Sequence, residues 1–208
     1  MDHAFWHERW RDGRIAFHEG QPNALLSRHA GELPAKSRVL VPLCGKAADL
    51  AYLAALGHEV VGVELVESAV RGFFAERGLT PVESTVGALR RFEADGVVLL
   101  AGDFFAVTTA DVGRIDAFYD RAAIIALPPD LRPAYVRHLR GLLAPAAVGV
   151  VITLQYDQTR MDGPPFAVGE AELRAHFAGA QVELLHERVA GGRAAEVGAI
   201  ERCWRVRG

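Results

Sequence analysis

Residues 38–64 read RVLVPLCGKAADLAYLAALGHEVVGVE, and this stretch decides the fold that the rest of the chain follows. Residues 38–43 are apolar and rich in β-branched side chains, a composition typical of a strand buried on both faces. Pro42 is expected at the end of that strand, because proline cannot donate a hydrogen bond to a sheet. A tight glycine turn leads into a helix over residues 47–56, and residues 59–64 form a second strand. The stretch therefore predicts a β-α-β unit.

The second strand of this unit ends in a carboxylate, which points to a nucleoside ligand. Glu64 follows Gly45 by nineteen residues, close to the roughly twenty-residue offset at which an acid meets a ribose in dinucleotide-binding folds. The turn at Gly45 lacks the three glycines of GxGxxG, so a backbone cradle for a pyrophosphate is not expected. S-adenosylmethionine is a nucleoside ligand without a phosphate, and it fits this turn better than a dinucleotide does.

Length, charge and cysteine content favour one soluble domain over residues 1–208. Half of the residues are hydrophobic and the formal net charge is −3, which gives no electrostatic footprint for nucleic acid. The longest apolar run, near residues 144–154, is too short for a membrane helix, and the first residues do not resemble a signal peptide. Cys44 and Cys203 have no metal-ligand spacing, so we expect reduced thiols and no metal site. We expect a cytoplasmic monomer that binds neither membrane nor nucleic acid.

Strands and helices alternate after the opening unit, as in a parallel α/β sheet. Further strands are expected at 97–103, 115–120, 147–155, 181–189 and 199–206, and further helices at 67–78, 129–143 and 170–177. The last two strands have no expected helix between them and should pair antiparallel. Residues 80–96 are less regular and predict a short hairpin or a loop insertion. The pattern predicts a doubly wound, Rossmann-like, mostly parallel sheet of seven strands with a terminal antiparallel hairpin and helices on both faces.

Two segments are expected to lie over the ends of these strands. Residues 1–30 carry two aromatic-rich pieces and predict an N-terminal helical cover, while residues 36–206 form the Rossmann-like core. Residues 156–169 contain a Gly-Pro-Pro-Phe run and cannot form a regular element. A loop of that length inside a compact domain is more often functional than idle. We therefore expect both segments to border a ligand.

Short motifs along nearly the whole chain resemble those of one known family. They are FWHERW at 5–10, AFH at 16–18, VPLCGKAADL at 41–50, GHEVVGVEL at 57–65, YDRAA at 119–123 and GPPF at 163–166. In this combination and order the sequence resembles the bacterial thiopurine S-methyltransferases, which belong to the class I S-adenosylmethionine-dependent methyltransferases. The resemblance implies methyl transfer from that cofactor to the thiol of small aromatic or heterocyclic acceptors.

The resemblance also implies which residues make the site. Cofactor contacts fall on the following residues: Trp10, Leu43, Gly45, Glu64, Asp103, Phe104 and Arg121. Substrate contacts fall on Phe17, Arg121, Pro164 and Pro165. The stretch 190–198 departs from the family pattern, because it is rich in glycine and alanine where the family often carries a further substrate-facing arginine, and Arg193 matches that position only loosely.

The chemistry assigns roles to some of these residues and leaves an alternative for each. Methyl transfer is an in-line displacement that depends on positioning, so no catalytic nucleophile is expected. Glu64 would accept the ribose hydroxyls, or be a solvated strand end. Trp10 would attract the sulfonium through its aromatic face, or pack in the core. Arg121 would favour an acceptor thiolate, or pair with Asp120. Asp103 would meet the adenine edge, or cap a helix.

Other functions remain open on the residues alone. One alternative is a methyltransferase whose natural acceptor is a selenium or tellurium compound or another small metabolite. A nicotinamide-dependent oxidoreductase shares the β-α-β unit and the terminal acid, although the single glycine speaks against it. A non-catalytic nucleoside-binding module would bind the cofactor without turnover, and it would have no use for an aromatic cover or a long Gly-Pro-Pro-Phe loop.

Overall fold

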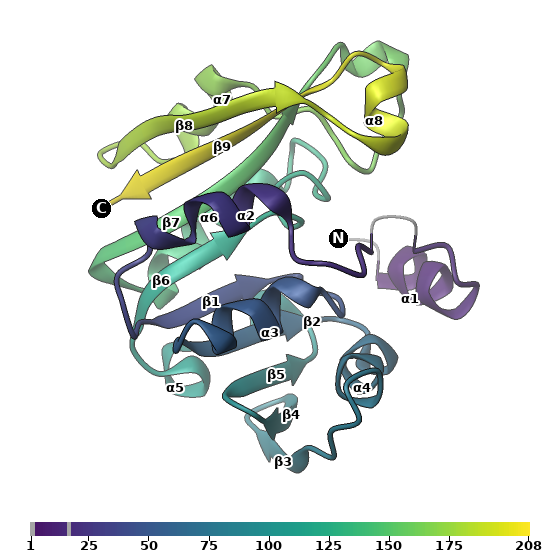
Figure 1. Cartoon of the computed structure of the whole chain (residues 1–208), viewed down its shortest axis with the longest axis vertical. Helices are drawn as coiled ribbons and strands as arrows, with labels where there is room; N and C mark the ends of the chain where they lie inside the picture. The colour runs from purple at the N-terminus through teal and green to yellow at the C-terminus, as the bar shows by residue number, and fades with distance from the viewer. Residues whose placement is uncertain (1–2, 16–17) are drawn as a thin grey trace.

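The computed structural model describes residues 3–15 and 18–208, and these residues form one nine-stranded sheet in the order β3-β4-β5-β2-β1-β6-β7-β9-β8 (Figure 1). The strands are β1 (Arg38–Pro42), β2 (Glu59–Glu64), β3 (Val82–Val86), β4 (Leu89–Ala94), β5 (Val97–Ala101), β6 (Ile115–Asp120), β7 (Leu143–Gln155), β8 (Gln181–Val189) and β9 (Ile200–Arg207). Strands β5, β2, β1, β6 and β7 run parallel to one another. Strand β9 is antiparallel to both β7 and β8.

The described helices cover both faces of the sheet. They are α1 (His3–Arg11), α2 (Ala24–His29), α3 (Ala48–Ala55), α4 (Glu67–Ala75), α5 (Thr109–Val112), α6 (Arg132–Leu142), α7 (Glu170–His176) and α8 (Gly192–Glu196), with single turns of 3₁₀ helix at Ala30–Glu32, Phe104–Ala106 and Gln158–Arg160. Figure 1 shows α1 apart from the sheet, on the side toward which β1, β2 and β6 point. The alternating pattern along the sequence thus gives the mixed α/β fold that was predicted.

The prediction of seven strands is wrong, because residues 82–94 add two more. Strands β3 and β4 form a hairpin around a two-residue turn at Gly87 and Ala88, and β4 pairs antiparallel with β5. Gly87 has a φ of +55°, which suits the first position of such a turn. Strand β3 reads VESTV and is mostly exposed, so it lacks the apolar alternation by which strands are recognised.

The connection between the last two strands also differs from the prediction. The stretch after β8 was expected to hold no helix, yet it contains the short helix α8. Strands β8 and β9 nevertheless pair antiparallel along most of their length. A single turn of helix fits here because it reverses the chain without leaving the sheet edge, and Ala190 and Ala199 close its base through a backbone hydrogen bond of 2.9 Å.

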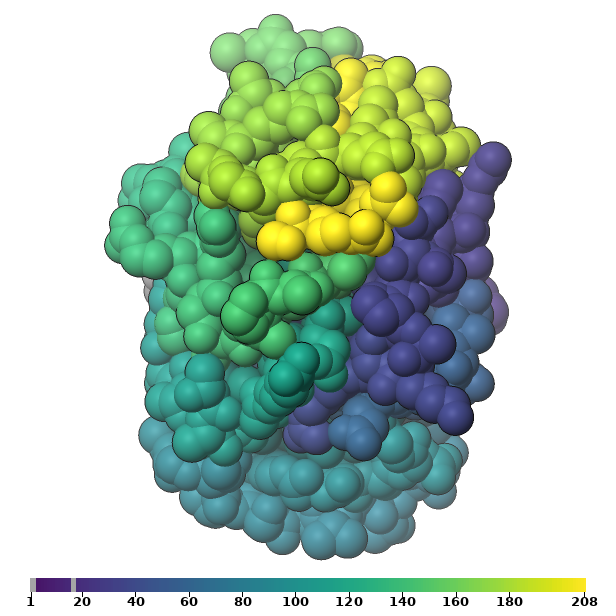
Figure 2. Space-filling view, turned by 90° about the vertical axis from the view of Figure 1, so that its left-hand side faces the viewer, coloured from purple at the N-terminus to yellow at the C-terminus, as the bar shows by residue number. Residues whose placement is uncertain are grey.

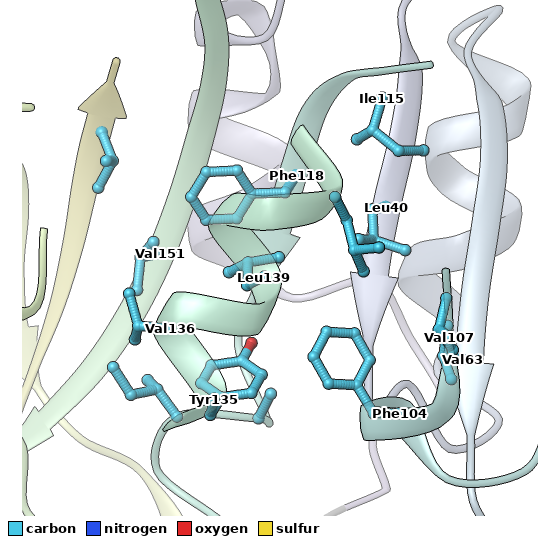
Figure 3. Packing of buried hydrophobic residues seen from close by; sticks show 14 of the residues in the cluster. Leu40, Val63, Phe104, Val107, Ile115, Phe118, Tyr135, Val136, Leu139 and Val151 are labelled. Carbon is cyan, nitrogen blue, oxygen red and sulfur yellow. The ribbon is translucent and has the colours of Figure 1, made fainter. Parts of the chain in front are cut away.

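Each face of the sheet has its own apolar core. Helices α5, α6 and α7 pack on one face around Leu40, Phe118 and Trp204, and Figure 3 shows Phe118, Tyr135 and Phe104 within this cluster. Helices α2, α3 and α4 pack on the other face around Val39, Val41 and their neighbours. Residues 39–41 of β1 therefore alternate between the two cores, as strand geometry requires. This double burial fixes the position of the strand ends that form the site.

The last strand contacts the segment that precedes β1, on the side of the molecule away from α1 (Figure 1). Arg205 of β9 forms an ion pair with Glu32 over 2.6 Å. Figure 2 shows the yellow C-terminal strand beside the indigo segment that contains α2. This contact ties the start of the core to the last strand and leaves the carboxyl ends of the parallel strands accessible.

Candidate active site

A cavity of about 570 Å³ lies at the carboxyl ends of β1, β2 and β6, where α/β sheets bind their ligands. Its wall also includes α1, residues 18–19, the proline loop near residue 164 and the segment around α8. The volume is within the usual range for small-molecule sites. Of the predicted site residues, those that line the cavity are Trp10, Leu43, Gly45, Glu64, Arg121, Pro164 and Pro165.

The carboxylate of Glu64 is held rigidly by the backbone at the cavity wall. One of its oxygens accepts a hydrogen bond from the Gly45 N–H and the other from the Val66 N–H, both over 2.9 Å. Leu43 adopts a left-handed backbone conformation with a φ of +50°, which is unusual for a residue with a side chain and is typical of functional sites. This turn brings the Gly45 N–H opposite the end of β2. The side chain of Glu64 is therefore positioned before any ligand binds.

Burial dominates the titration of the groups around this turn. It raises the pKa of Glu64, while the backbone N–H groups of Val66, Gly45 and Leu65 oppose the rise. Burial, with the nearby charge of Glu64 as a smaller contribution, also raises the pKa of the Cys44 thiol well above its ordinary value. A protonated, buried thiol is not a nucleophile. Cys44 is thus a small buried residue of this wall, as predicted.

Trp10 of α1 lies directly over the glycine turn. A Cβ atom at Gly45 would lie 3.1 Å from the Trp10 ring, and Gly45 has a φ of +54°. Glycine is required here both for the left-handed backbone and for the close approach of the ring. The Trp10 ring therefore borders the cavity beside the turn, and Trp10 is not among the residues of either core.

Arg121 follows β6 directly and pairs with a residue of the N-terminal segment at the cavity wall. Its guanidinium forms an ion pair with Glu19, 102 positions earlier in the chain, and its side chain is only 19% exposed. The alternative pairing with Asp120 is wrong, because that carboxylate turns into the core. Asp120 accepts hydrogen bonds from the N–H groups of Ala123 and Ile124 and from the Tyr135 hydroxyl.

A second buried carboxylate lines the cavity, and it was not among the predicted site residues. Asp49 is 2% exposed and accepts hydrogen bonds from the Asn23 N–H over 2.6 Å and the Tyr119 hydroxyl over 3.1 Å. Burial raises its pKa, and the positive charge of Arg121 is among the opposing causes. Asp49 shares the buried face of α3 with Leu50 and Leu53. A charged residue on an otherwise apolar helix face was the signal available in the sequence.

The proline loop is fastened to the core from several sides. The Tyr156 hydroxyl donates to the Pro165 carbonyl over 2.6 Å, and the Phe166 N–H donates to the Ile125 carbonyl over the same distance. Arg132 is 1% exposed and donates to the Ala167 carbonyl over 3.0 Å. Pro164 and Pro165 therefore form a fixed wall of the cavity.

Two predicted residues do not line this cavity. Phe104 is 2% exposed, and its ring centroid lies 5.4 Å from that of Tyr135. Both rings belong to the cluster in Figure 3. Asp103 caps the 3₁₀ turn by accepting from the Phe105 N–H over 3.0 Å, and His3 lies 3.4 Å away. Their contacts with the adenine stay a prediction. Phe17 lies outside the described residues.

Residues 3–15 and 18–208 include no group of three or more His, Cys, Asp or Glu side chains arranged to hold a metal ion. None of their helices combines the length and the apolar character that a membrane span needs.

Solved structures of methyltransferases share this fold. A methyltransferase from Anabaena variabilis, described as S-adenosylmethionine-dependent, superposes with a TM-score of 0.69 at 13% identity, covering 99% of this chain and 94% of that chain. The 1,6-didemethyltoxoflavin-N1-methyltransferase of Burkholderia thailandensis, solved with 1,6-didemethyltoxoflavin and S-adenosylhomocysteine, gives 0.67 at 20% identity and covers 99% and 86%. The fold is therefore that of the class I S-adenosylmethionine-dependent methyltransferases.

Closer relatives define the family. A model of the thiopurine S-methyltransferase (TPMT) family matches residues 1–201. The thiopurine S-methyltransferase of Pseudomonas fluorescens is 45% identical over 217 residues, which span all of both chains. That of Pseudomonas paraeruginosa is 50% identical over 180 residues, 86% of this chain and 83% of the relative. The chain belongs to the thiopurine S-methyltransferase family, and the predicted resemblance is confirmed.

Proposed function

We propose that this protein transfers a methyl group from S-adenosylmethionine to the sulfur of small aromatic or heterocyclic thiols. The observation that carries the proposal is the buried Glu64 carboxylate, fixed by two backbone N–H groups at the wall of the cavity. Family membership supports the same reaction. Family membership gives no support to the alternative of a nicotinamide-dependent oxidoreductase.

The residues present fit the methyl donor. Each oxygen of Glu64 accepts one backbone hydrogen bond and keeps capacity for another, which matches the two hydroxyls of a ribose. The Trp10 ring over Gly45 offers an aromatic face to a sulfonium, an attraction worth about 0.5 to 2 kcal/mol. The turn at residues 43–45 provides no phosphate cradle, and this donor requires none.

The chain contributes position and charge to the reaction. The donor would supply a methyl group on a positively charged sulfur. The acceptor sulfur would attack the methyl carbon in line, and the donor sulfur would leave. Glu64 and Trp10 would hold the sugar and the methionine part at the strand ends, and Pro164 and Pro165 would border the acceptor on the other side. Arg121 would stabilise the acceptor as a thiolate, lowering the pKa of its thiol. Holding the reactants in line is the main source of rate in such a displacement.

The wider organisation is proposed on the same basis. Residues 1–30 act as a cover over the site and residues 36–206 as the core of one methyltransferase domain. The protein works as a cytoplasmic monomer on small-molecule thiols. Free, buried Cys44 and Cys203 are consistent with a reducing compartment.

A methyl-transfer assay tests the proposal. Purified protein is incubated with S-adenosylmethionine and a panel of aromatic thiols, selenite and tellurite, and methylated products are measured. We expect turnover of the thiols, and a loss of kcat/KM with Arg121→Ala. Faster turnover of selenite or tellurite would favour those acceptors as the natural ones. Donor binding without turnover of any acceptor would contradict the proposal and indicate a binding module.

A further inference from the structure

Glu19 and Arg121 form an ion pair inside the proposed acceptor site. Both residues line the cavity, and they lie 102 positions apart in the chain. The Arg121 side chain is 19% exposed, while that of Glu19 is 49% exposed. The pair thus joins a partly buried cation on the core to a more accessible anion on the N-terminal segment.

The charge of Arg121 is also balanced from the buried side. Asp49 lines the same cavity, and Arg121 and Glu19 are among the charges that act on its pKa, the first lowering it and the second raising it. Arg121 therefore lies near two carboxylates of its own chain. When an anionic acceptor approaches the Arg121 guanidinium, the charge of that group is already balanced by carboxylates of the protein.

Two other cations of the cavity wall have carboxylate partners of their own. Lys46 pairs with Glu76, and Arg188 pairs with Glu201 over 2.6 Å. The N-terminal segment carries another half-exposed carboxylate, Glu8, which pairs with Arg14 over 3.3 Å. Neither Glu8 nor Arg14 lines the cavity.

We propose that Glu19 is a specificity-determining residue, whose carboxylate occupies Arg121 and disfavours acceptors that carry a negative substituent besides the reacting sulfur. This inference rests on the proposed function. An acceptor with a carboxylate has to displace Glu19 or lie beside it, whereas an uncharged analogue does neither. The residue thereby filters acceptors by charge, while the methyl-transfer chemistry stays the same.

The test compares two acceptors that differ only in charge: 4-mercaptobenzoate and 4-mercaptobenzamide. We measure kcat/KM for both with the parent protein and with Glu19→Gln. The expected result is a rise of about two- to fivefold in the benzoate-to-benzamide ratio, the size that partly exposed ion pairs allow. Glu19→Asp keeps the charge, so its ratio should stay near that of the parent.

Glu8→Gln is the matched control, because Glu8 is a carboxylate of the same N-terminal segment with similar exposure, and its partner Arg14 does not line the cavity. Its ratio should equal that of the parent. An unchanged ratio in Glu19→Gln, or an equal change in Glu8→Gln, would overturn the inference. If the parent methylates neither acceptor, nor any other thiol, the proposed function itself fails.

Discussion

The backbone N–H of Gly45 donates a hydrogen bond over 2.9 Å to the carboxylate of Glu64, joining the turn after β1 to the end of β2. This bond therefore couples the turn after β1 to the acid at the end of β2. The turn thus sets the position of the Glu64 carboxylate, which a ligand would contact. Changes in the turn are expected to reach the ligand through this bond.

Gly45→Ala tests this link. The added Cβ would lie 3.1 Å from Trp10, and alanine at a φ of +54° is strained by about 1–2 kcal/mol. We expect lower stability and a severalfold weaker affinity for S-adenosylhomocysteine. Gly57→Ala is the control, because Gly57 also has a positive φ, of +87°, but nothing lies near its Cβ. Gly57→Ala should lower stability without changing the affinity for S-adenosylhomocysteine. Equal affinity in Gly45→Ala and Gly57→Ala would contradict the coupling between the turn and Glu64.

Tyr156→Phe tests the role of the proline loop. The variant removes the hydroxyl that donates to the Pro165 carbonyl, a bond worth about 1 kcal/mol. We expect the acceptor KM to rise severalfold while donor affinity is unchanged, measured by steady-state kinetics and calorimetry. Tyr52→Phe, whose hydroxyl makes only a 3.4 Å bond to Ser27, should leave both parameters unchanged. A rise in KM in both variants would show a general effect.

Asp120 predicts a specific dependence of stability on pH. Burial raises the pKa of Asp120 from its ordinary 3.8 to about 6 in the folded protein, against the bonds from Tyr135, Ile124 and Ala123. A raised pKa favours the protonated form in the folded state, so this group stabilises the fold fully below about pH 4. That contribution, roughly 3 kcal/mol, is lost as the pH rises through 6.

The difference in unfolding free energy between the parent and Asp120→Asn isolates this contribution. The amide keeps an acceptor for the two N–H groups and does not titrate. Relative to this variant, the parent should lose stability between pH 4 and pH 6, as measured by denaturant unfolding. A difference that stays constant with pH would contradict the assignment. Because both proteins share every other carboxyl, the subtraction removes their contributions.

Gly149→Ala tests the packing of the sheet on α6 and α7. A Cβ at Gly149 would lie 2.1 Å from the Phe118 ring, which stacks on Phe177. We expect a loss of about 1–3 kcal/mol in unfolding free energy, since overpacking forces neighbouring side chains to shift. Gly141→Ala lies in α6 with open space around it, and should stabilise the protein by up to about 1 kcal/mol. Loss of stability in both Gly149→Ala and Gly141→Ala would show that replacing glycine, and not the contact with Phe118, causes the loss.

The parallel core was predictable because its signals are local. Strand β2 has the predicted bounds, Glu59–Glu64, and strand β6 those of 115–120, since buried apolar runs bounded by turns are easily recognised. The hairpin of β3 and β4 was not counted among the strands, because exposed β3 is held by its pairing with β4 and not by a buried face. Pairing across a sheet is not encoded in a short window of sequence.

Residues of the cavity wall were predictable mainly at the ends of the strands and in the motifs that carry the family resemblance. Glu64 and Gly45 follow from their offset, and the resemblance adds Trp10, Arg121 and the two prolines, all of which reach the cavity. The partners of charged groups were not predictable, because they come from distant segments. Glu19 is 102 positions from Arg121, and Asp49 is 70 positions from Tyr119.

Calorimetric titration of S-adenosylhomocysteine into the parent, Glu64→Gln and Glu59→Gln tests whether Glu64 holds the methyl donor. Glu59 lies at the other end of β2 and is largely exposed, so it controls for a change of charge on the same strand. Thermal unfolding of each variant confirms that it is folded. We expect tight binding by the parent and by Glu59→Gln, and at least tenfold weaker binding by Glu64→Gln, since charge-assisted hydrogen bonds contribute about 1.5–3 kcal/mol each. Equal affinity in all three proteins would contradict this role of Glu64.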